Sequence, residues 1–312
     1  MKRILTVVLG VLCILVGIAG LFLPILQGWA FIFMGLALIS PRLAGRLRRQ
    51  VTRRLFKKDI VFLNDWKKSG VEAGFTTRHF PLVLHKTDDL LDDINKKQFV
   101  FLLNDRGKGK KRGVCSRFAL LNQVHGDGIA VLDDPARYAN DGIHHFPDCD
   151  AALTNLEGMS LLVFTADCLS VFLCAGDWVG LVHAGWRGSK KKIVQKAAVL
   201  LSQRSGVGPD KIKVILGPCI GPRHYEVGPE FRLEFPESSL EDRDGKLYFN
   251  LAKENERQLR EAGVLAVNIS DHGACTFSEQ KNFYSFRRER GSAGRMVSFI
   301  GRYSSETPEV PT

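Results

Sequence analysis

The chain has 312 residues, enough for one large domain or for a domain of about 250 residues with an appendage. Ten of its 44 Lys and Arg residues, and none of its 33 Asp and Glu residues, lie in the first 58 positions. The remaining 34 basic and 33 acidic residues leave the rest of the chain nearly neutral, which excludes a nucleic-acid-binding domain, because such a domain is basic in its own right. Seven cysteines without regular or CxxC spacing argue against a disulfide framework and indicate reduced thiols.

An uncharged stretch of 37 residues covers positions 4–40. As one helix it would be about 55 Å long, against a bilayer core of about 30 Å. Pro24 and a Gln-Gly-Trp turn at 27–29 divide it, so the sequence predicts a two-helix transmembrane hairpin over residues 1–41. Basic residues flank both ends and none lies at the tip. The positive-inside rule therefore predicts a membrane-anchored protein whose following domain faces the cytoplasm.

Two features of this N-terminal region leave alternatives open. Residues 1–3 and the apolar run after them open like a secretory signal peptide, but the second apolar stretch at 31–39 favours the hairpin. Residues 25–38 also resemble small bacterial membrane proteins with a Pro-Gly-Trp hairpin tip, which implies anchoring. The basic juxtamembrane segment 42–58 fits an amphipathic helix on anionic headgroups and a solvated flank equally well.

The region from 59 to 303 has the pattern of an α/β domain of the α+β type, with a mixed, largely antiparallel sheet and flanking helices. A charged stretch at 86–113 indicates an exposed loop, and the Ser/Glu/Pro-rich tail 304–312 is predicted to be disordered. Helical spacing predicts helices over 189–205, ending at Gly206, and over 250–261. Short apolar runs predict buried strands at 118–124, 129–132, 160–166, 169–173, 179–183 and 213–216.

Cys168 directly precedes the strand at 169–173 and His183 ends the strand at 179–183, and these two strands form a predicted hairpin with Ala175 and Gly176 at its tip. That turn places the thiol directly opposite the imidazole, and a turn shifted to Gly176-Asp177 still leaves both on one face. A thiol and an imidazole so close can ligate one zinc ion. His125, between an apolar run and Gly126, is the candidate third ligand. For each residue alone, a structural role is the alternative.

Several motifs follow one another in order along the chain: TTR (76–78), NQVHG (122–126), DAALTN (150–155), TADCLSVFL (165–173), VHAGWRGS (182–189), LGPCIGPRHYEVG (216–228), CT (275–276) and YSFRRERGSAGRMVSFI (284–300). Together they resemble the YfiH family over about residues 70–312, most densely from position 122. Members of this family are labelled laccase-domain or polyphenol-oxidase proteins and are described as purine nucleoside phosphorylases that also deaminate adenosine.

The resemblance implies a zinc ion bound by His125, Cys168 and His183, and purine nucleosides and phosphate as substrates. Three protein ligands leave a fourth coordination position open, which is the pattern of catalytic rather than structural zinc. Copper is the less favoured metal. Oligomeric state does not follow from these motifs.

Five further residues are candidates around such a centre. Arg187, just before the 189–205 helix, and Arg78 are placed to bind phosphate, although a surface role fits each equally well. Asp167, beside the candidate thiol ligand, is positioned to orient a ligand or to shuttle protons, and an ordinary strand-end carboxylate is its alternative. Gln123 and Asn155 are weaker candidates for contacts to the base or the ribose.

The sequence also departs from the family pattern. His79-Phe-Pro-Leu stands where a Gly-Gly-x-Ser stretch is usual, and residues 80–113 look rebuilt, which leaves one wall of the pocket undefined. Ser170 replaces a usual proline. The spacing from Cys168 to His183 is two residues shorter than the family pattern, and an even deletion at a hairpin tip keeps both side chains on one face.

Three rival functions remain. Cys168 and His183 could act without metal as the nucleophile and base of a thiol hydrolase. Two histidines and a cysteine also resemble a copper set, but the eight histidines include no His-x-His pair, which disfavours a copper-dependent phenol oxidase. A membrane-anchored scaffold without activity is the non-enzymatic alternative, supported only by the rebuilt 80–113 region.

Overall fold

The structure is a computed structural model that describes residues 60–63, 65–66, 70–80 and 117–303. The chain divides into two units, residues 1–57 and 58–312. Within the described ranges, no helix is both long and apolar enough to cross a bilayer. Four predicted features lie outside the described residues: the hairpin at 1–41, the basic segment at 42–58, the loop at 86–113 and the tail at 304–312.

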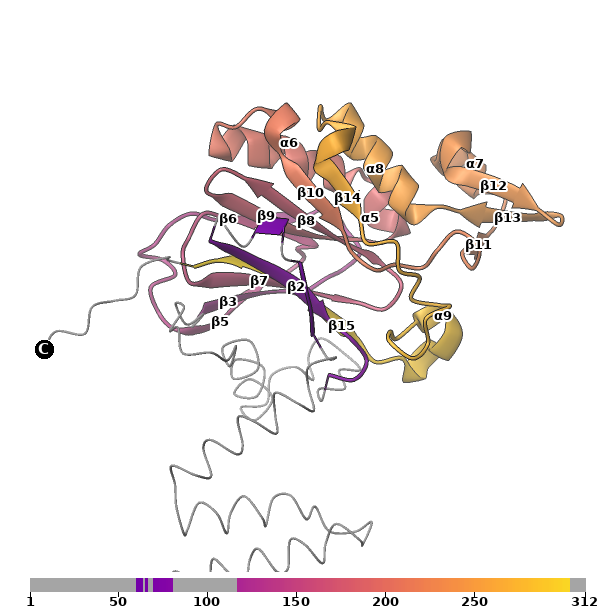
Figure 1. The fold of residues 1–312 in the computed structure, drawn as a ribbon, viewed down its shortest axis with the longest axis horizontal. Coiled ribbons are helices and arrows are strands. Elements are labelled where there is room, and N and C mark those ends of the chain that lie inside the picture. The colour runs from indigo at the N-terminus through magenta and orange to yellow at the C-terminus, as the bar shows by residue number, and fades with distance from the viewer. Residues whose placement is uncertain (1–59, 64, 67–69, 81–116, 304–312) are drawn as a thin grey trace, which may run out of the picture. The chain divides into compact units, whose positions relative to one another are not determined.

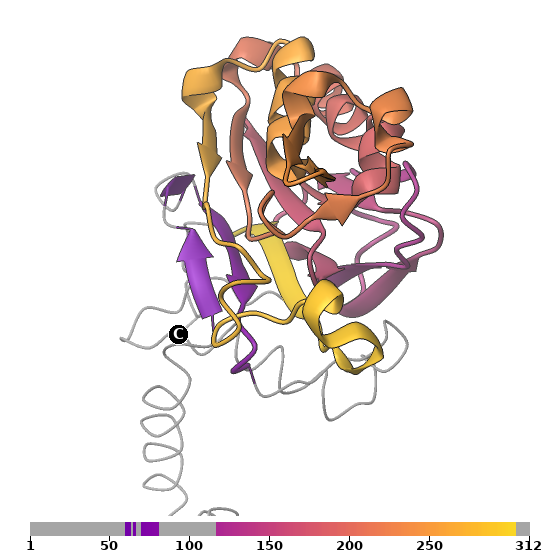
Figure 2. The same cartoon turned by 90° about the vertical axis from the view of Figure 1, so that its right-hand side faces the viewer.

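Two six-stranded sheets face each other in the second unit (Figures 1 and 2). The first sheet has the order β1-β2-β15-β7-β3-β5, with the bounds Ile60–Leu63, Val71–Thr76, Met296–Arg302, Met159–Thr165, Arg117–Leu121 and Gly142–Phe146. The second sheet has the order β14-β10-β8-β9-β6-β4, with the bounds Ile269–Asp271, Lys213–Leu216, Leu169–Ala175, Trp178–Ala184, Ala151–Thr154 and Ile129–Leu132.

Strand pairing is mixed and mainly antiparallel, as predicted. Only the pairs β3–β5, β3–β7, β4–β6 and β10–β14 are parallel among the strands of these two sheets. The division into two sheets was not predicted, because an apolar run indicates a buried strand without indicating which sheet it joins.

Apolar side chains form three layers, because strand residues alternate between the two faces of a sheet. Even positions of β8, such as Phe172, face the first sheet and pack with Leu161. Odd positions, such as Val171, face the helices and pack with Ala197. Phe299 belongs to a third layer on the outer face of the first sheet. Strands β7, β8 and β9 are buried at every position, since both faces are covered, which explains their uninterrupted apolar sequences.

Helices α5 (Trp186–Lys190), α6 (Ile193–Ser205) and α8 (Leu251–Glu261) lie on the outer face of the second sheet (Figure 1). The single helix predicted over 189–205 is wrong in its start, because Lys192 has a left-handed backbone (φ 60°) and separates α5 from α6. Both predicted ends that depend on local chemistry are confirmed. Gly206 (φ 68°) ends α6, and the side chain of Asn250 caps α8 by accepting a hydrogen bond from Lys253 N.

Apart from one 3-10 helix just before β10, the remaining elements lie between β10 and β15 along the chain, and none of them was predicted. A small sheet has the order β11-β13-β12, with the bounds Glu226–Val227, Lys246–Phe249 and Leu240–Arg243. Two short α-helices, α7 (Phe231–Glu234) and α9 (Phe286–Glu289), flank the region that opens into the site described below. Short 3-10 helices occupy Pro209–Lys211, Glu237–Ser239, Ala266–Asn268 and Arg290–Ser292.

Candidate functional site

The β8–β9 hairpin brings Cys168 and His183 to one end of the second sheet. Its register pairs Ser170 with His183, so the turn is Gly176-Asp177, and the predicted direct opposition of Cys168 and His183 is wrong by two residues. Gly176 adopts a left-handed backbone (φ 56°) that suits a tight turn. Because the shift is even, the pair still shares a face, and Cys168 lies just before β8 begins.

Asp150 holds the ring of His183 in place. The β6–β9 register pairs Ala151 with Val182, which sets Asp150 opposite His183, and His183 N donates to Asp150 O at 2.7 Å. His183 Nδ1 lies 2.7 Å from Asp150 Oδ1, and both side chains are buried. This bond leaves His183 Nε2 as the ligand atom. Burial opposes the charge of Asp150, but hydrogen bonds from His183 and from backbone N–H groups hold the pKa of its carboxyl below the ordinary value.

The same carboxylate fixes the loop that carries His125 from β3 to β4. Three consecutive backbone N–H groups donate to Asp150: Val124 N (3.1 Å) and Gly126 N (2.7 Å) to Oδ2, and His125 N (3.0 Å) to Oδ1. His125 itself has a left-handed backbone (φ 58°), which is costly for a residue with a side chain. One buried carboxylate thus orients the imidazole of His183 and holds the backbone that carries His125.

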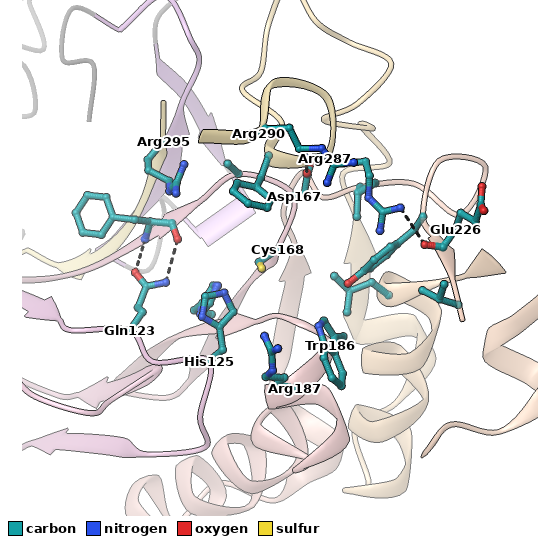
Figure 3. A pocket seen from close by; sticks show the side chains of 18 of the residues that line it. Gln123, His125, Asp167, Cys168, Trp186, Arg187, Glu226, Arg287, Arg290 and Arg295 are labelled. Carbon is teal, nitrogen blue, oxygen red and sulfur yellow. Dashed lines mark hydrogen bonds between the residues drawn. The ribbon is translucent and has the colours of Figure 1, made fainter. Parts of the chain in front are cut away.

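Gln123 secures the other end of this loop to the first sheet. Its Nε2 donates to Phe164 O at 2.9 Å, and its Oε1 accepts from Phe164 N at 2.7 Å (Figure 3). Gln123 lines the cavity, as its proposed contact to substrate requires, but its amide is fully engaged with the end of β7. Its position indicates that it clamps the loop across the end of the two sheets.

Three potential ligand atoms converge. One atom each from His125, Cys168 and His183 lies within 4.8 Å of the other two, and the imidazole rings meet edge to face at 4.9 Å between centroids. Gly185 makes room for them, because a Cβ there would lie 3.0 Å from Cys168 Sγ and 3.1 Å from His125 Cδ2. A thiolate with two imidazoles suits zinc, and His125 faces the exposed side. The donor set and spacing therefore fit a metal ion.

Electrostatic interaction between Cys168 and His183 favours the thiolate form of Cys168, which is the form that binds metal ions. Burial opposes ionisation of Cys168, but the charge of His183 and hydrogen bonds from both histidines lower the pKa of the thiol to about 6. Burial also opposes protonation of His183, but the Cys168 thiolate and Asp150 raise the pKa of its imidazole to about 9. Without a metal the pair therefore favours a thiolate and an imidazolium at neutral pH, and binding of a metal ion by both residues would release the proton from His183.

A cavity of about 880 Å³ opens above these residues. One side is largely apolar, with Trp186, Phe231 and Leu251 among its lining residues. Arg187 lies beside Trp186 with its guanidinium 4.6 Å from the ring centroid, and Arg287, Arg290 and Arg295 line the opposite wall (Figure 3). The cavity therefore combines an aromatic surface with a cationic one over the thiolate.

Asp167 also lines the cavity, next to Cys168 (Figure 3). Its Oδ1 accepts from Thr276 Oγ1 at 2.6 Å, and its Oδ2 accepts from Arg287 N at 2.6 Å. Asp167 has a left-handed backbone (φ 93°), which these bonds stabilise. Its carboxylate therefore holds the backbone at Arg287 against the segment that carries Cys168. This arrangement favours a positioning role for Asp167 over a role in proton transfer.

Two predicted substrate-binding residues do not line the cavity. Arg78 pairs with Glu289 (Nη1 to Oε1, 3.1 Å), donates to Gln280 O, and lies 4.9 Å from the ring centroid of Tyr284. Asn155 follows the far end of β6, the strand that Asp150 precedes, so the length of the strand separates it from the metal ligands. Their positions favour structural roles for both.

Sequence reasoning missed five residues that shape the site: Asp150, Tyr225, Arg287, Arg290 and Arg295. Asp150 opens the DAALTN motif, and a carboxylate directly before an all-apolar strand could have indicated a buried partner. The arginine-rich motif at 284–300 was recognised, but nothing in it separates Arg290 from Arg288. In the structure Arg288 pairs with Glu289 and does not line the cavity.

Fold and site together define a two-sheet α/β protein with a Cys-His-His centre beneath a cationic cavity. Residues 103–303 match the family described as multi-copper polyphenol oxidoreductase laccase, and the chain belongs to this family. Residues 3–54 separately match a family described as putative transmembrane protein (PGPGW).

Among curated relatives, the chain is 33% identical over 256 residues to purine nucleoside phosphorylase YlmD of Geobacillus stearothermophilus, covering 75% of this chain and 91% of the relative. It is 36% identical over 188 residues to purine nucleoside phosphorylase YfiH of Escherichia coli, covering 58% of this chain and 72% of the relative.

Solved structures agree with the fold. The Bacillus licheniformis hypothetical protein YfiH is 25% identical, with a TM-score of 0.65 over 78% of this chain and 97% of that chain. The Geobacillus stearothermophilus YlmD structure is 29% identical, with a TM-score of 0.63 over 76% and 93%. The mixed α/β fold expected from the YfiH resemblance is therefore confirmed.

Proposed function

We propose that this protein is a zinc-dependent purine nucleoside phosphorylase that also deaminates adenosine. One observation carries the proposal: two imidazoles and a thiolate converge at the base of a cavity that has both an aromatic and a cationic wall. The relatives named purine nucleoside phosphorylase support the substrate class. Purine bases stack on aromatic rings, and phosphate binds to guanidinium groups.

His125, Cys168 and His183 would hold the zinc ion, with Asp150 orienting the His183 ring and fixing the His125 backbone. Three protein ligands leave one coordination position open, and zinc in such a site supplies Lewis acidity when bound. The rest of the chemistry belongs to the chain. Trp186 and Phe231 offer apolar surface to the base, and the arginines of the cavity hold phosphate beside the ribose.

In phosphorolysis, a phosphate oxygen forms a bond to the anomeric carbon of the ribose while the bond from that carbon to the purine nitrogen breaks. The purine leaves with the electron pair and takes up a proton, and ribose-1-phosphate is the second product. The protein would accelerate this step by holding both reactants in reacting geometry.

A metal assay combined with a nucleoside assay tests the proposal. Purified protein should contain zinc and should release free base from inosine or adenosine only when phosphate is present. Formation of inosine from adenosine without phosphate would establish the deaminase activity separately. A zinc-containing protein that consumes neither nucleoside, with or without phosphate, would refute the assignment.

The metal-free hydrolase is the second candidate, because Cys168 and His183 share a hydrogen bond and Asp150 completes a Cys-His-Asp arrangement. Metal removal separates the two functions. The hydrolase predicts activity that survives a chelator and is abolished by thiol alkylation, whereas the phosphorylase predicts activity that the chelator removes and added zinc restores. Copper-dependent phenol oxidation is the least favoured alternative, because the described residues provide one potential metal group.

We further propose that residues 4–40 anchor the protein to a membrane with its catalytic domain in the cytoplasm. The match of residues 3–54 to a putative transmembrane protein family supports this proposal, as does the charge distribution of the sequence. Alkaline carbonate extraction should leave the full-length protein in the membrane pellet. Release of the protein into the supernatant would argue against the anchor.

A further inference from the structure

Three arginines from one short segment form a wall of the cavity. Arg287, Arg290 and Arg295 all line it, and Figure 3 shows them on one side of Cys168, with His125 and Arg187 on the other. They lie far along the chain from the metal ligands. Their convergence on this space therefore depends on the tertiary fold.

These guanidinium groups have no carboxylate partner within the described part of the chain. Arg295 is half-buried, and its hydrogen bonds go to the carbonyl oxygens of Ala293 and Gly294. Burial lowers the pKa of Arg295, although the charges of Cys168 and Asp167 act in the opposite direction. The side chain of Arg290 makes no hydrogen bond or ion pair to another described residue, and Arg287 donates to a backbone oxygen, that of Glu226, at 2.9 Å.

The carboxylates of the cavity are already engaged elsewhere. Both oxygens of Asp167 accept hydrogen bonds, one from Thr276 and one from the backbone of Arg287. Glu226 pairs with Lys246 at 2.9 Å. The neighbouring Arg288, which does not line the cavity, shows the contrast, because it pairs with Glu289 at 2.6 Å. The arginines on the cavity side of this segment are therefore the ones without an ion-pair partner among the described residues.

The segment is held in a fixed position relative to the metal ligands. Asp167 accepts Arg287 N and directly precedes Cys168, so one residue couples the arginine wall to the thiolate. Ser285 caps the short helix α9 by accepting from Arg288 N at 3.2 Å. Arg290 has a left-handed backbone (φ 55°). This conformation is costly for a residue with a side chain and persists only where the surrounding contacts hold it in place. These restraints preorganise the arginines before any ligand binds.

We propose that Arg287, Arg290 and Arg295 form the phosphate-binding site of this cavity, which rests on the proposed phosphorolytic function for its role in turnover. A tetrahedral phosphate offers several oxygens to the planar, multi-donor guanidinium groups, and it compensates the charge left unpaired in a partly desolvated space. Arg187, which stacks on Trp186 on the opposite wall, is not part of this site. The proposed phosphate site therefore differs from the one predicted from the sequence, which used Arg187 and Arg78.

Calorimetric titration of the full-length protein with inorganic phosphate, at constant ionic strength, tests the site without requiring turnover. Arg290→Gln and Arg295→Gln should each weaken phosphate binding by about tenfold to a hundredfold, the value of a charge-assisted hydrogen bond. Metal content should stay at the wild-type level. Arg260→Gln, an exposed arginine of α8 outside the cavity, is the matched control and should bind phosphate like wild type.

Arg295→Lys checks for a folding defect, since it keeps the charge and should bind phosphate more tightly than the glutamine variant. Unchanged phosphate affinity in both glutamine variants would overturn the proposal. If these variants lose phosphate binding but wild type consumes no nucleoside, the anion site stands and the proposed function falls. If wild type and variants release base with the same KM for phosphate, the function stands and the arginine site falls.

Discussion

At the scale of single residues, Asp150 links the two histidines of the candidate metal centre. Its four hydrogen bonds are made to donors only: three backbone N–H groups and the ring of His183. A carboxylate is the side chain that accepts all four without presenting a competing donor. The partner of a metal-binding histidine fixes the orientation and the tautomer of its ring, so Asp150 should determine metal affinity without touching the metal.

Asp150→Asn should lower metal affinity by about 10–100-fold, the usual cost of losing such a partner. Whichever oxygen the amide NH₂ replaces, it faces N–H donors, because Val124 and Gly126 bond to Oδ2 and His125 bonds to Oδ1. Competition with a chromophoric chelator measures the effect. Asp148→Asn, at an exposed position nearby, is the control, and equal affinities in the two variants would contradict this role.

Gly185 is required for a different reason, because a methyl group at this position would lie within 3.1 Å of both Cys168 Sγ and His125 Cδ2. Gly185→Ala should therefore separate the ligands and weaken metal binding by about tenfold or more, since overpacking costs about 1–3 kcal/mol. Gly291→Ala, whose added Cβ would meet nothing within 4 Å, provides the comparison. The same chelator competition measures both, and wild-type affinity in Gly185→Ala would exclude the steric role.

At the scale of secondary-structure elements, a buried polar network joins α5 to α8. Ser189 Oγ bonds to the amide of Asn255, and Gln258 Nε2 donates to Ser189 O at 2.7 Å. Glu254 extends this network to Ser239 and Arg257 and is almost fully buried. Helix α5 carries Trp186 and Arg187, so the network positions one wall of the cavity.

Glu254 should make stability depend on pH. Burial opposes its charge, but hydrogen bonds from Arg257, Ser239 and Gln258 hold the pKa of its carboxyl below the ordinary value of 4.5. A lowered pKa means that the carboxylate contributes stability above pH 4.5, and this contribution is lost as the pH falls through the lowered value. Glu254→Gln should therefore lower the free energy of unfolding at neutral pH by about 1–3 kcal/mol.

Urea unfolding of wild type and Glu254→Gln at several pH values measures this dependence. The difference between the two proteins should be constant above pH 4.5 and should shrink as the pH falls further. A difference that stays the same at all pH values would show that the carboxylate charge is not involved.

Elements defined by local chemistry could be predicted from the sequence, and contacts made by the tertiary fold could not. Gly206 and Asn250 mark helix ends through their own backbone and side chain, and the alternation along β8 and β9 placed Cys168 and His183 on one face. The exact register could not be predicted, because two adjacent dipeptides both suited the turn.

Most of the cavity lining could not be predicted, because it also depends on contacts that form only in the tertiary fold. Arg78 and Arg287 are both arginines in recognisable motifs, but Arg78 meets Glu289 and Arg287 is held at the cavity by Asp167. Both outcomes depend on partners more than 100 positions away in the sequence. The candidate metal ligands could be named because the hairpin pattern puts Cys168 and His183 on one face and the family resemblance implies His125, and the structure brings the three together.

At the scale of the whole second unit, residues at the ends of strands from both sheets line the candidate site, among them Phe164 of β7 and His183 of β9. The second sheet supplies His183 and Asp150, the β3–β4 loop supplies His125, and the C-terminal segment supplies the arginine wall. Because these parts meet only in the folded domain, a bound metal should stabilise the native state by linkage.

X-ray absorption spectroscopy of the purified protein tests most directly whether this centre holds a metal. We expect about one zinc ion per chain, with one sulfur neighbour at about 2.3 Å and two imidazole nitrogens at about 2.0–2.1 Å. Replacement of Cys168 by serine should remove the sulfur signal. A spectrum of the wild-type protein without sulfur, or a protein that retains no metal when purified with zinc present, would contradict this expectation.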